Sequence, residues 1–294
     1  MKEELYHYTS LQALFSIIST QTLWLSNLSN SNDPNELYLS CEEYNQYLKN
    51  EMLDPYHGES YIQKNNRIIG DIYGISFTVS KDNLSQWERY GDNRAGVAIN
   101  IDANLIQKLL EQKYDFKFEL YRVRYTEQQK INFIKDLVKK KKNHDYKCPI
   151  QEFVIDGLYY IFHYSTARVI FKKPKFNIEK EYRLYHDPTY CDFMEELLKD
   201  TKNLSNTMQR LILRHRKIKE ELKLSNNDKQ YSIMRNGINS YLSFNLKLLG
   251  DDYTKIIKEI ILGPKCPQNE KELKNFLNSY GFDPIIKKSE IDIR

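Results

Sequence analysis

The stretch that decides the fold class reads GISFTVS, at residues 74–80. The apolar side chains of Ile75, Phe77 and Val79 alternate along it with hydroxyl side chains. The hydroxyl residues are Ser76, Thr78 and Ser80. Because a β-strand sends successive side chains to opposite faces, the pattern predicts a strand with one face in the core and one polar face.

Outward from this strand, short strands and helices follow one another in no regular order. Strands are predicted at residues 5–9, 22–26, 96–101, 117–125, 178–185, 259–262 and 284–287. Helices are predicted at residues 10–20 (capped by Thr9 or Ser10), 36–52, 85–90 and 270–280. Since no regular βαβ alternation is present, we expect one compact α+β domain over residues 1–294, with two small sheets and with polar helical insertions at about 127–170 and 192–230.

The composition excludes several classes of protein. Apolar residues make up 40% of the chain, which is enough for a sizeable core. No apolar run approaches the roughly 20 residues of a membrane span, and no secretory signal pattern is present. The four cysteines are scattered without a CxxC pair, so we expect a cytoplasmic protein with reduced thiols and no membrane partner. The sequence contains no phosphate loop, no glycine-rich dinucleotide motif and no metal-ligand spacing, so no metal is expected.

Two basic clusters interrupt a chain whose net charge is only +4: the run Lys139–Lys142 and a cluster within residues 210–219. Each is typical of a solvated helix face. The alternative is a phosphate-binding patch, where a nucleic-acid partner would bind.

Three segments carry side chains that suit a ligand site. In the first, YHYTS at residues 6–10, a strand followed by a helix can present the imidazole of His7 at a cleft; the alternative is a hydrogen-bonded core histidine. The second combines the polar face of residues 74–80 with the ring of Tyr90 as a stacking surface. Its alternative is that Trp87 and Tyr90, three residues apart, are the core face of a helix.

The third segment reads EKEYRL, at residues 179–184. On a strand, Glu179, Glu181 and Arg183 share one face, and two carboxylates beside a guanidinium suit a reactive centre. The alternative is a surface strand with a cross-strand ion pair.

These segments resemble a bacterial family, the domain of unknown function numbered 2971. The resemblance is carried, in this order along most of the chain, by the motifs HYTS (7–10), NDPNE (32–36), SFT (76–78), WERY (87–90), EKEYR (179–183) and EIILGP (259–264).

A more distant resemblance is to ADP-ribosyltransferases of the diphtheria-toxin and poly(ADP-ribose)-polymerase type, whose sites follow a His-Tyr-Glu pattern. This chain has the same three residue types in the same order. They are His7 on a predicted strand, Tyr90 after a small-polar strand, and a glutamate on a late strand. The resemblance implies an ADP-ribosyltransferase-like fold with NAD as substrate. Such an enzyme would cleave the nicotinamide–ribose bond and transfer ADP-ribose to a protein or nucleic-acid acceptor.

The same resemblance implies a role for each residue. His7 would hydrogen-bond the adenosine ribose, Tyr90 would stack on the nicotinamide, and Glu181 would accept a hydrogen bond from the nicotinamide ribose. Glu179 would orient the acceptor, although it competes with Glu181 for the catalytic role. Arg183 would contact the pyrophosphate or pair with Glu181. The other residues implied to line the site are Thr9, Ser76 and Thr78.

An enzyme of this kind would suit a toxin or a phage-defence effector. The rival hypothesis is a non-catalytic module that binds nucleic acid or a nucleotide on the same fold and does not turn over NAD. A third interpretation is a structural partner protein whose tyrosines and glutamates serve only packing.

Overall fold

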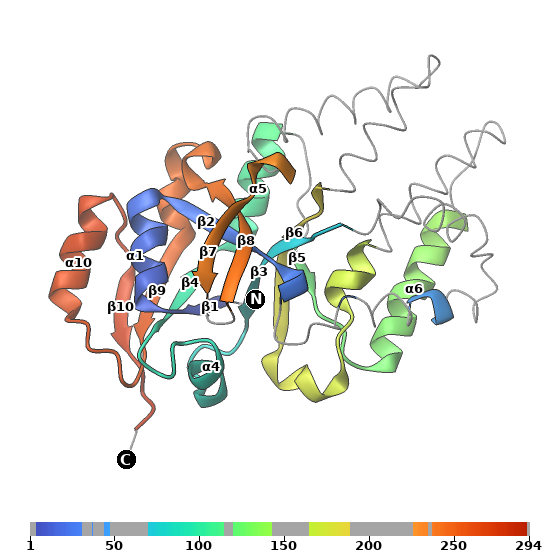
Figure 1. Ribbon diagram of the computed structural model, residues 1–294, viewed down its shortest axis with the longest axis horizontal. Coiled ribbons are helices and arrows are strands. Elements are labelled where there is room, and N and C mark those ends of the chain that lie inside the picture. The colour runs from blue at the N-terminus through green and yellow to red at the C-terminus, as the bar shows by residue number, and fades with distance from the viewer. Residues whose placement is uncertain are drawn as a thin grey trace.

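The computed structural model describes residues 4–30, 37, 44–47, 70–114, 120–142, 165–188, 226–234 and 237–292. The strands are β1 (Tyr6–Thr9), β2 (Thr22–Asn27), β3 (Tyr73–Thr78), β4 (Val97–Ile101), β5 (Leu120–Arg122), β6 (Glu181–His186), β7 (Gln230–Met234), β8 (Gly237–Asn245), β9 (Ile257–Leu262) and β10 (Ile285–Lys288). The α-helices are α1 (Leu11–Thr20), α4 (Leu84–Arg89), α5 (Ala103–Tyr114), α6 (Glu127–Lys142) and α10 (Glu270–Ser279). Short 3-10 turns lie at η1 (Leu28–Asn30), η2 (Pro174–Glu179), η3 (Asn226–Asp228), η4 (Leu246–Leu249) and η5 (Asp251–Ile256). The protein is therefore mixed α/β, with a large open sheet and several helices (Figure 1).

One sheet of ten strands forms the frame, and it forks at β3. One edge of β3 pairs with β6 along the whole strand, and β6 also pairs with β5. The other edge is divided, because β2 pairs with Tyr73 and Gly74 whereas β1 pairs with Thr78. From these contacts one branch continues as β1-β4-β9-β10 and the other as β2-β8-β7. The expectation of two small sheets is therefore wrong, because β3 joins both branches in one hydrogen-bonded sheet.

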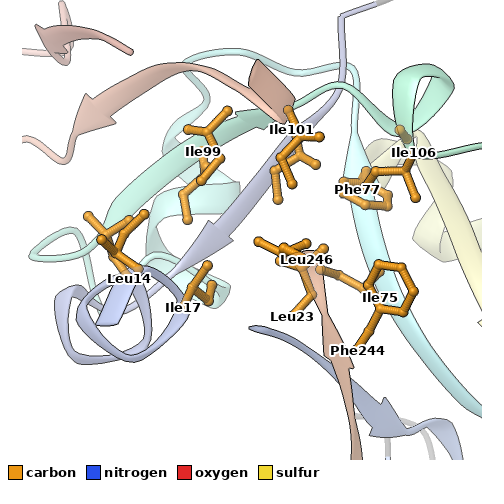
Figure 2. Close-up of a cluster of buried hydrophobic side chains, with 14 of the residues drawn as sticks. Leu14, Ile17, Leu23, Ile75, Phe77, Ile99, Ile101, Ile106, Phe244 and Leu246 are labelled. Carbon is orange, nitrogen blue, oxygen red and sulfur yellow. The ribbon is translucent and has the colours of Figure 1, made fainter. Parts of the chain in front are cut away.

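The largest core lies between the two branches. Figure 2 shows Ile99 of β4 and Leu14 of α1 converging with Leu23, Ile75 and Phe244, which come from β2, β3 and β8. The helix that carries Leu14 begins where the sequence predicts, since the Ser10 hydroxyl accepts a hydrogen bond from the backbone N–H of Ala13 at 3.1 Å. At the outer end of this core α1 and α10 lie side by side, with the rings of Phe15 and Phe276 stacked 5.1 Å apart.

Two smaller clusters lie elsewhere. One packs Ile134 of α6 against the segment 165–171, which is helical over residues 165–170. The other gathers Tyr6 and Tyr8 of β1 around Trp87 of α4, and this second cluster positions the candidate site.

Three details of the predicted elements need correction. The strand expected at 178–185 begins only at Glu181, because Pro174 opens a 3-10 turn and Lys180 ends it in the left-handed region (φ 45°). The helical stretch expected to run to residue 230 ends before it, since η3 and then β7 occupy its last residues. The hairpin of β7 and β8 was not predicted at all.

Other predicted elements are covered only in part. Of the helix expected at residues 36–52, residue 37 and residues 44–47 are helical and the rest lies outside the described residues. Residues 32–36, 143–164 and 189–225 also lie outside them. Within the described ranges, no helix has both the length and the apolar character needed to cross a membrane.

Candidate functional site

The short helix α4 carries Tyr90 at its C-terminal end, and its position depends on Trp87. The Asn83 side chain caps the helix by accepting from the backbone N–H of Gln86 at 3.2 Å. The Trp87 ring is fully buried and meets the Tyr8 ring edge-on, with centroids 4.7 Å apart. Its indole N–H donates to an Asp82 carboxylate oxygen at 2.6 Å. Trp87 is thus a core residue, whereas Tyr90 is half-buried and stays at the rim.

Three glycines allow this close packing around Trp87. A Cβ added at Gly91 would lie 2.5 Å from Cε3 of Trp87, and one added at Gly263 would lie 3.1 Å from its Cζ3. A Cβ at Gly96 would lie 2.9 Å from the backbone of Gly91. Two of the sequence motifs, WERY at 87–90 and the glycine of EIILGP at 259–264, therefore meet in space.

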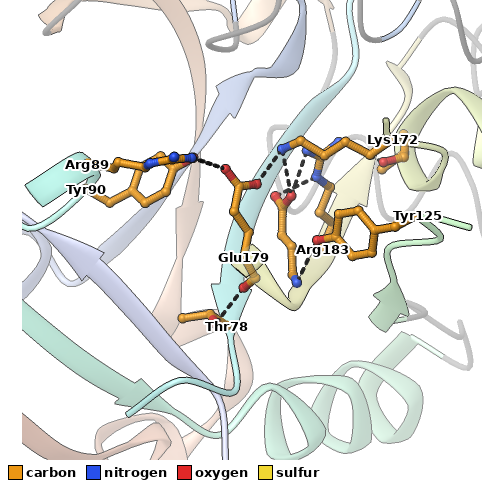
Figure 3. A network of polar contacts seen from close by, with 9 residues as sticks. Thr78, Arg89, Tyr90, Tyr125, Lys172, Glu179 and Arg183 are labelled. Atoms are coloured by element: carbon orange, nitrogen blue, oxygen red, sulfur yellow. Dashed lines mark hydrogen bonds and ion pairs between the residues drawn. The ribbon is translucent and has the colours of Figure 1, made fainter. Parts of the chain in front are cut away.

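Glu179 ends the turn η2 rather than lying on a strand, so its side chain is not aligned with Glu181 by strand periodicity as predicted. Its backbone carbonyl accepts from the Thr78 hydroxyl at 2.7 Å. Its carboxylate accepts from the Tyr90 hydroxyl at 2.8 Å through Oε1, and Arg89 Nη1 lies 3.4 Å from the same oxygen. Figure 3 shows Glu179 between this Arg89–Tyr90 pair and Lys172.

Glu181, the first residue of β6, is held by two buried cations. Arg183 donates to Oε1 through Nε at 2.7 Å and to Oε2 through Nη2 at 2.9 Å. Lys172 Nζ lies 3.1 Å from the same Oε2 and 2.7 Å from Oε2 of Glu179, so one ammonium bridges both carboxylates. The backbone N–H of Glu181 donates to the Tyr125 hydroxyl at 2.9 Å.

These contacts decide the protonation of Glu181. Desolvation by burial acts most strongly and raises its pKa, but the charges of Arg183 and Lys172, with hydrogen bonds from Arg183 and Ser76, outweigh it and lower the pKa to about 2. Glu181 is therefore ionised at neutral pH. Tyr90 is affected in the opposite sense, because burial and the negative charge of Glu179 raise its pKa to about 12.

Arg183 follows one of its two predicted alternatives, whereas Lys172 was not predicted. Arg183 pairs with Glu181, is only 3% exposed, and also donates to the Val169 carbonyl at 2.7 Å. Lys172 was not predicted, because it is the first lysine of KKPK at 172–175, a basic stretch that reads as solvated. The signal that marks it is the buried apolar segment before it, which only the tertiary structure shows.

The structure does not bring His7 onto the same face as the carboxylates. In antiparallel pairs, partner residues share a face. Tyr6 is paired with Thr78, and Thr78 with Glu181, whereas His7 is paired with the core residue Ile99. His7 and Thr9 therefore lie on the opposite face of β1 from Tyr6, and the cleft expected to join His7, Tyr90 and Glu181 remains a prediction.

His7 instead lies at the fork of the sheet. Its Nδ1 lies 2.9 Å from the Ser76 carbonyl, and because a carbonyl only accepts, Nδ1 carries a proton. The imidazole is half-buried and packs edge-on beside Phe77, at 6.3 Å between ring centroids. Burial lowers the pKa of His7 and outweighs the opposing effect of the Ser76 hydrogen bond, so the ring is neutral at pH 7. The contacts at the site thus join Tyr90, Glu179 and Glu181 with their cations, while Ser76 and Thr78 lie beneath them on β3.

The side chains of the two predicted basic clusters lie outside the described residues. The run Lys139–Lys142 lies at the end of α6, where side chains are outside the described residues, and residues 210–219 are outside them entirely. Among the described residues, no group of three or more His, Cys, Asp or Glu side chains is arranged to hold a metal ion.

Comparison with known protein families gives a match that overlaps the candidate site. Residues 86–184 match the model of a family described as protein of unknown function (DUF2971). The matched region is about a third of the chain; it begins in α4 and ends in β6, so it contains WERY (87–90), Lys172 and EKEYR (179–183). The match supports the family assignment that these motifs predicted. No curated protein and no solved structure matches the chain significantly.

Proposed function

We propose that this protein binds NAD and cleaves its nicotinamide–ribose bond, as an ADP-ribosyltransferase-like enzyme, beside Tyr90 and one of the two carboxylates Glu179 and Glu181. The observation that carries the proposal is a pair of neighbouring carboxylates, bridged by Lys172, with the Tyr90 hydroxyl in hydrogen-bond contact with Glu179. The forked sheet, antiparallel except at the β9–β10 pair, supports it as well. The ADP-ribosyltransferase fold itself is part of the proposal.

The reaction develops positive charge on the ribose, and a nearby carboxylate can stabilise that charge. In the reaction the C1′–N1 bond breaks, and its electron pair leaves with the nicotinamide ring, which becomes neutral. The ribosyl cation then bonds to the nucleophilic atom of an acceptor or of water, whose proton passes to solvent. A fixed carboxylate stabilises the developing positive charge more in the transition state than in the ground state.

The Tyr90 ring would stack on the nicotinamide at the rim of the sheet. Tyr90→Ala is then expected to weaken NAD binding about three- to tenfold, since one aromatic contact contributes about 0.5–1.5 kcal/mol. Tyr90→Phe keeps the ring and is the matched control, with binding close to that of the wild type. The acceptor is a protein or nucleic-acid nucleophile under this proposal.

A second candidate function is a non-catalytic nucleotide-binding module, and two observations favour it. His7 lies on the opposite face from the carboxylates, and both oxygens of Glu181 are already engaged by buried cations. Under this candidate the protein binds a nucleotide without breaking it.

One experiment separates the candidates. NAD binding is measured by calorimetry up to millimolar concentration, and nicotinamide release is measured with and without cell lysate as acceptor pool. Binding with release supports the enzyme, and binding without release under either condition supports the module. Absence of NAD binding contradicts the proposed function.

A further inference from the structure

We infer that Glu179, and not Glu181, is the carboxylate that meets the ligand at this site, while Glu181, Lys172 and Arg183 form a buried base that holds it. The inference rests on the proposed function for its chemistry, but the contacts from which it is argued do not depend on that function. It reverses the roles that the sequence resemblance implies for the two glutamates.

Both carboxylate oxygens of Glu181 already accept hydrogen bonds from protein side chains. Arg183 forms two parallel charged hydrogen bonds to its two oxygens, at 2.7 and 2.9 Å, and Lys172 adds a third contact at Oε2. Ser76 adds a further side-chain hydrogen bond. A carboxylate offers about four lone-pair positions, so these partners satisfy it fully. A ligand hydroxyl would have to break a bidentate ion pair in the interior to reach this residue.

Glu179 is held differently on its two sides. Oε2 is anchored to the buried Lys172 at 2.7 Å. Oε1 faces Tyr90, a neutral donor, and Arg89, which stands at a long 3.4 Å with a side chain 49% exposed. Figure 3 shows Arg89 and Tyr90 on one side of Glu179 and Lys172 and Arg183 on the other.

The exposed fractions do not separate the glutamates, since their side chains are 6% and 8% exposed. The two glutamates differ in the residues that contact their carboxylate oxygens. The Arg89 contact at Oε1 is long and reaches solvent, so a ligand hydroxyl can take its place without uncovering a buried charge. Glu179 then keeps its Lys172 anchor while Oε1 stabilises the ribosyl cation left when the C1′–N1 bond of NAD breaks and nicotinamide departs with the electron pair.

Isosteric variants test the assignment through nicotinamide release and thermal unfolding measured on the same samples. Glu179→Gln is expected to lower kcat about 100-fold with little change in KM, because the charge interaction matures as the bond breaks. Its unfolding temperature is expected to stay closer to the wild-type value than that of Glu181→Gln. Glu181→Gln removes the carboxylate that faces Arg183 and one of the two that face Lys172, so its unfolding temperature is expected to fall further while kcat of the folded fraction stays within a few-fold of wild type.

A compensated variant covers the case in which Glu181→Gln does not fold. Glu181→Gln/Arg183→Met removes one buried charge pair together and leaves Lys172 paired with Glu179. Near-wild-type kcat in this variant supports the inference. A 100-fold loss of kcat in it, or full kcat in Glu179→Gln, overturns the inference.

A chemical probe gives a readout that does not depend on NAD at all. Carbodiimide with glycine ethyl ester modifies accessible carboxylates, and fragment mass spectra distinguish positions 179 and 181. Glu179 is expected to react first in the native protein, and faster in Tyr90→Phe, which removes the hydroxyl from Oε1. Glu181 reacting first, or both reacting at one rate, contradicts the inference. If the wild type shows this labelling order but does not bind NAD, the proposed function fails and the ligand-facing assignment stands.

Discussion

Glu181→Gln is expected to destabilise the protein most at neutral pH and progressively less as the pH falls. Gln keeps the shape of the side chain but removes the negative charge that faces Arg183 at 2.7 Å and Lys172 at 3.1 Å. Both cations are buried, so water cannot replace the lost carboxylate. Protonating Glu181 in the wild type removes the same charge, so acid makes the wild type resemble the variant.

The magnitude follows from the pKa of Glu181, which is about 2 in the folded protein against an ordinary value of 4.5. Because each step of one in pKa corresponds to about 1.4 kcal/mol, the folded state gains about 3 kcal/mol from ionised Glu181 at pH 7. Since the folded pKa is the lower one, this contribution is fully present above pH 4.5 and is lost as the pH falls through about 2. At pH 3 about 1 kcal/mol of it should remain, so the difference between wild type and variant should shrink by about 2 kcal/mol.

The measurement is urea unfolding of wild type and Glu181→Gln at pH 7, 5, 4 and 3, followed by far-ultraviolet circular dichroism. Glu88→Gln is the matched control, because Glu88 is exposed and lies 3.8 Å from Arg94 in a surface pair. Such a pair contributes little, so this control should stay within about 0.5 kcal/mol of wild type at every pH. A difference between wild type and Glu181→Gln that stays constant from pH 7 to pH 3 would refute the account of Glu181 as an ionised group held by buried cations.

The remaining predictions concern the packing around Tyr90 and the fork of the sheet. Trp87→Phe removes the indole donor to Asp82 and part of the ring volume, and should lower the free energy of unfolding by about 1–3 kcal/mol in urea titrations. Gly96→Ala places a methyl group against backbone atoms and should cost about 2 kcal/mol or more by the same assay, whereas an unchanged midpoint would show that the turn can move. The pKa of His7 is lowered by burial, so its NMR titration midpoint should lie below 6.5, and the stability it contributes should be lost as the pH falls below 6.5; a midpoint at or above 6.5 would contradict its burial.

The regular elements were largely predictable because their signals are local. The alternation in residues 74–80 became β3, and the hydroxyl of Ser10 caps α1 as one of two predicted caps. The amphipathic stretch at 270–280 became α10, capped by Asn269. These patterns depend on neighbours within a few residues along the chain, which the sequence shows directly.

Elements that depend on distant partners were predicted less well. The hairpin of β7 and β8 is stabilised by pairing of β8 with β2, more than 200 residues earlier in the chain, from Thr22↔Asn245 to Ser26↔Tyr241. Its own alternation is weak, because Tyr231, Ile233 and Ile238 remain exposed. A single sheet in place of two follows from the division of one edge of β3 between two strands, which no local pattern signals.

The residue types of the candidate site are evident along the chain: a tyrosine after a small-polar strand, then two glutamates and an arginine close together. How these residues contact one another depends on segments that are distant in the sequence. Lys180 adopts a left-handed backbone conformation, so Glu179 lies in the turn before β6 and not on the strand. Lys172, which no sequence pattern marked, contacts both carboxylates. The pairing of β1 places His7 on the opposite face from the carboxylates. The physical reason is that charge compensation acts through space over a few ångströms, whereas sequence patterns report only which face of its own element each residue occupies.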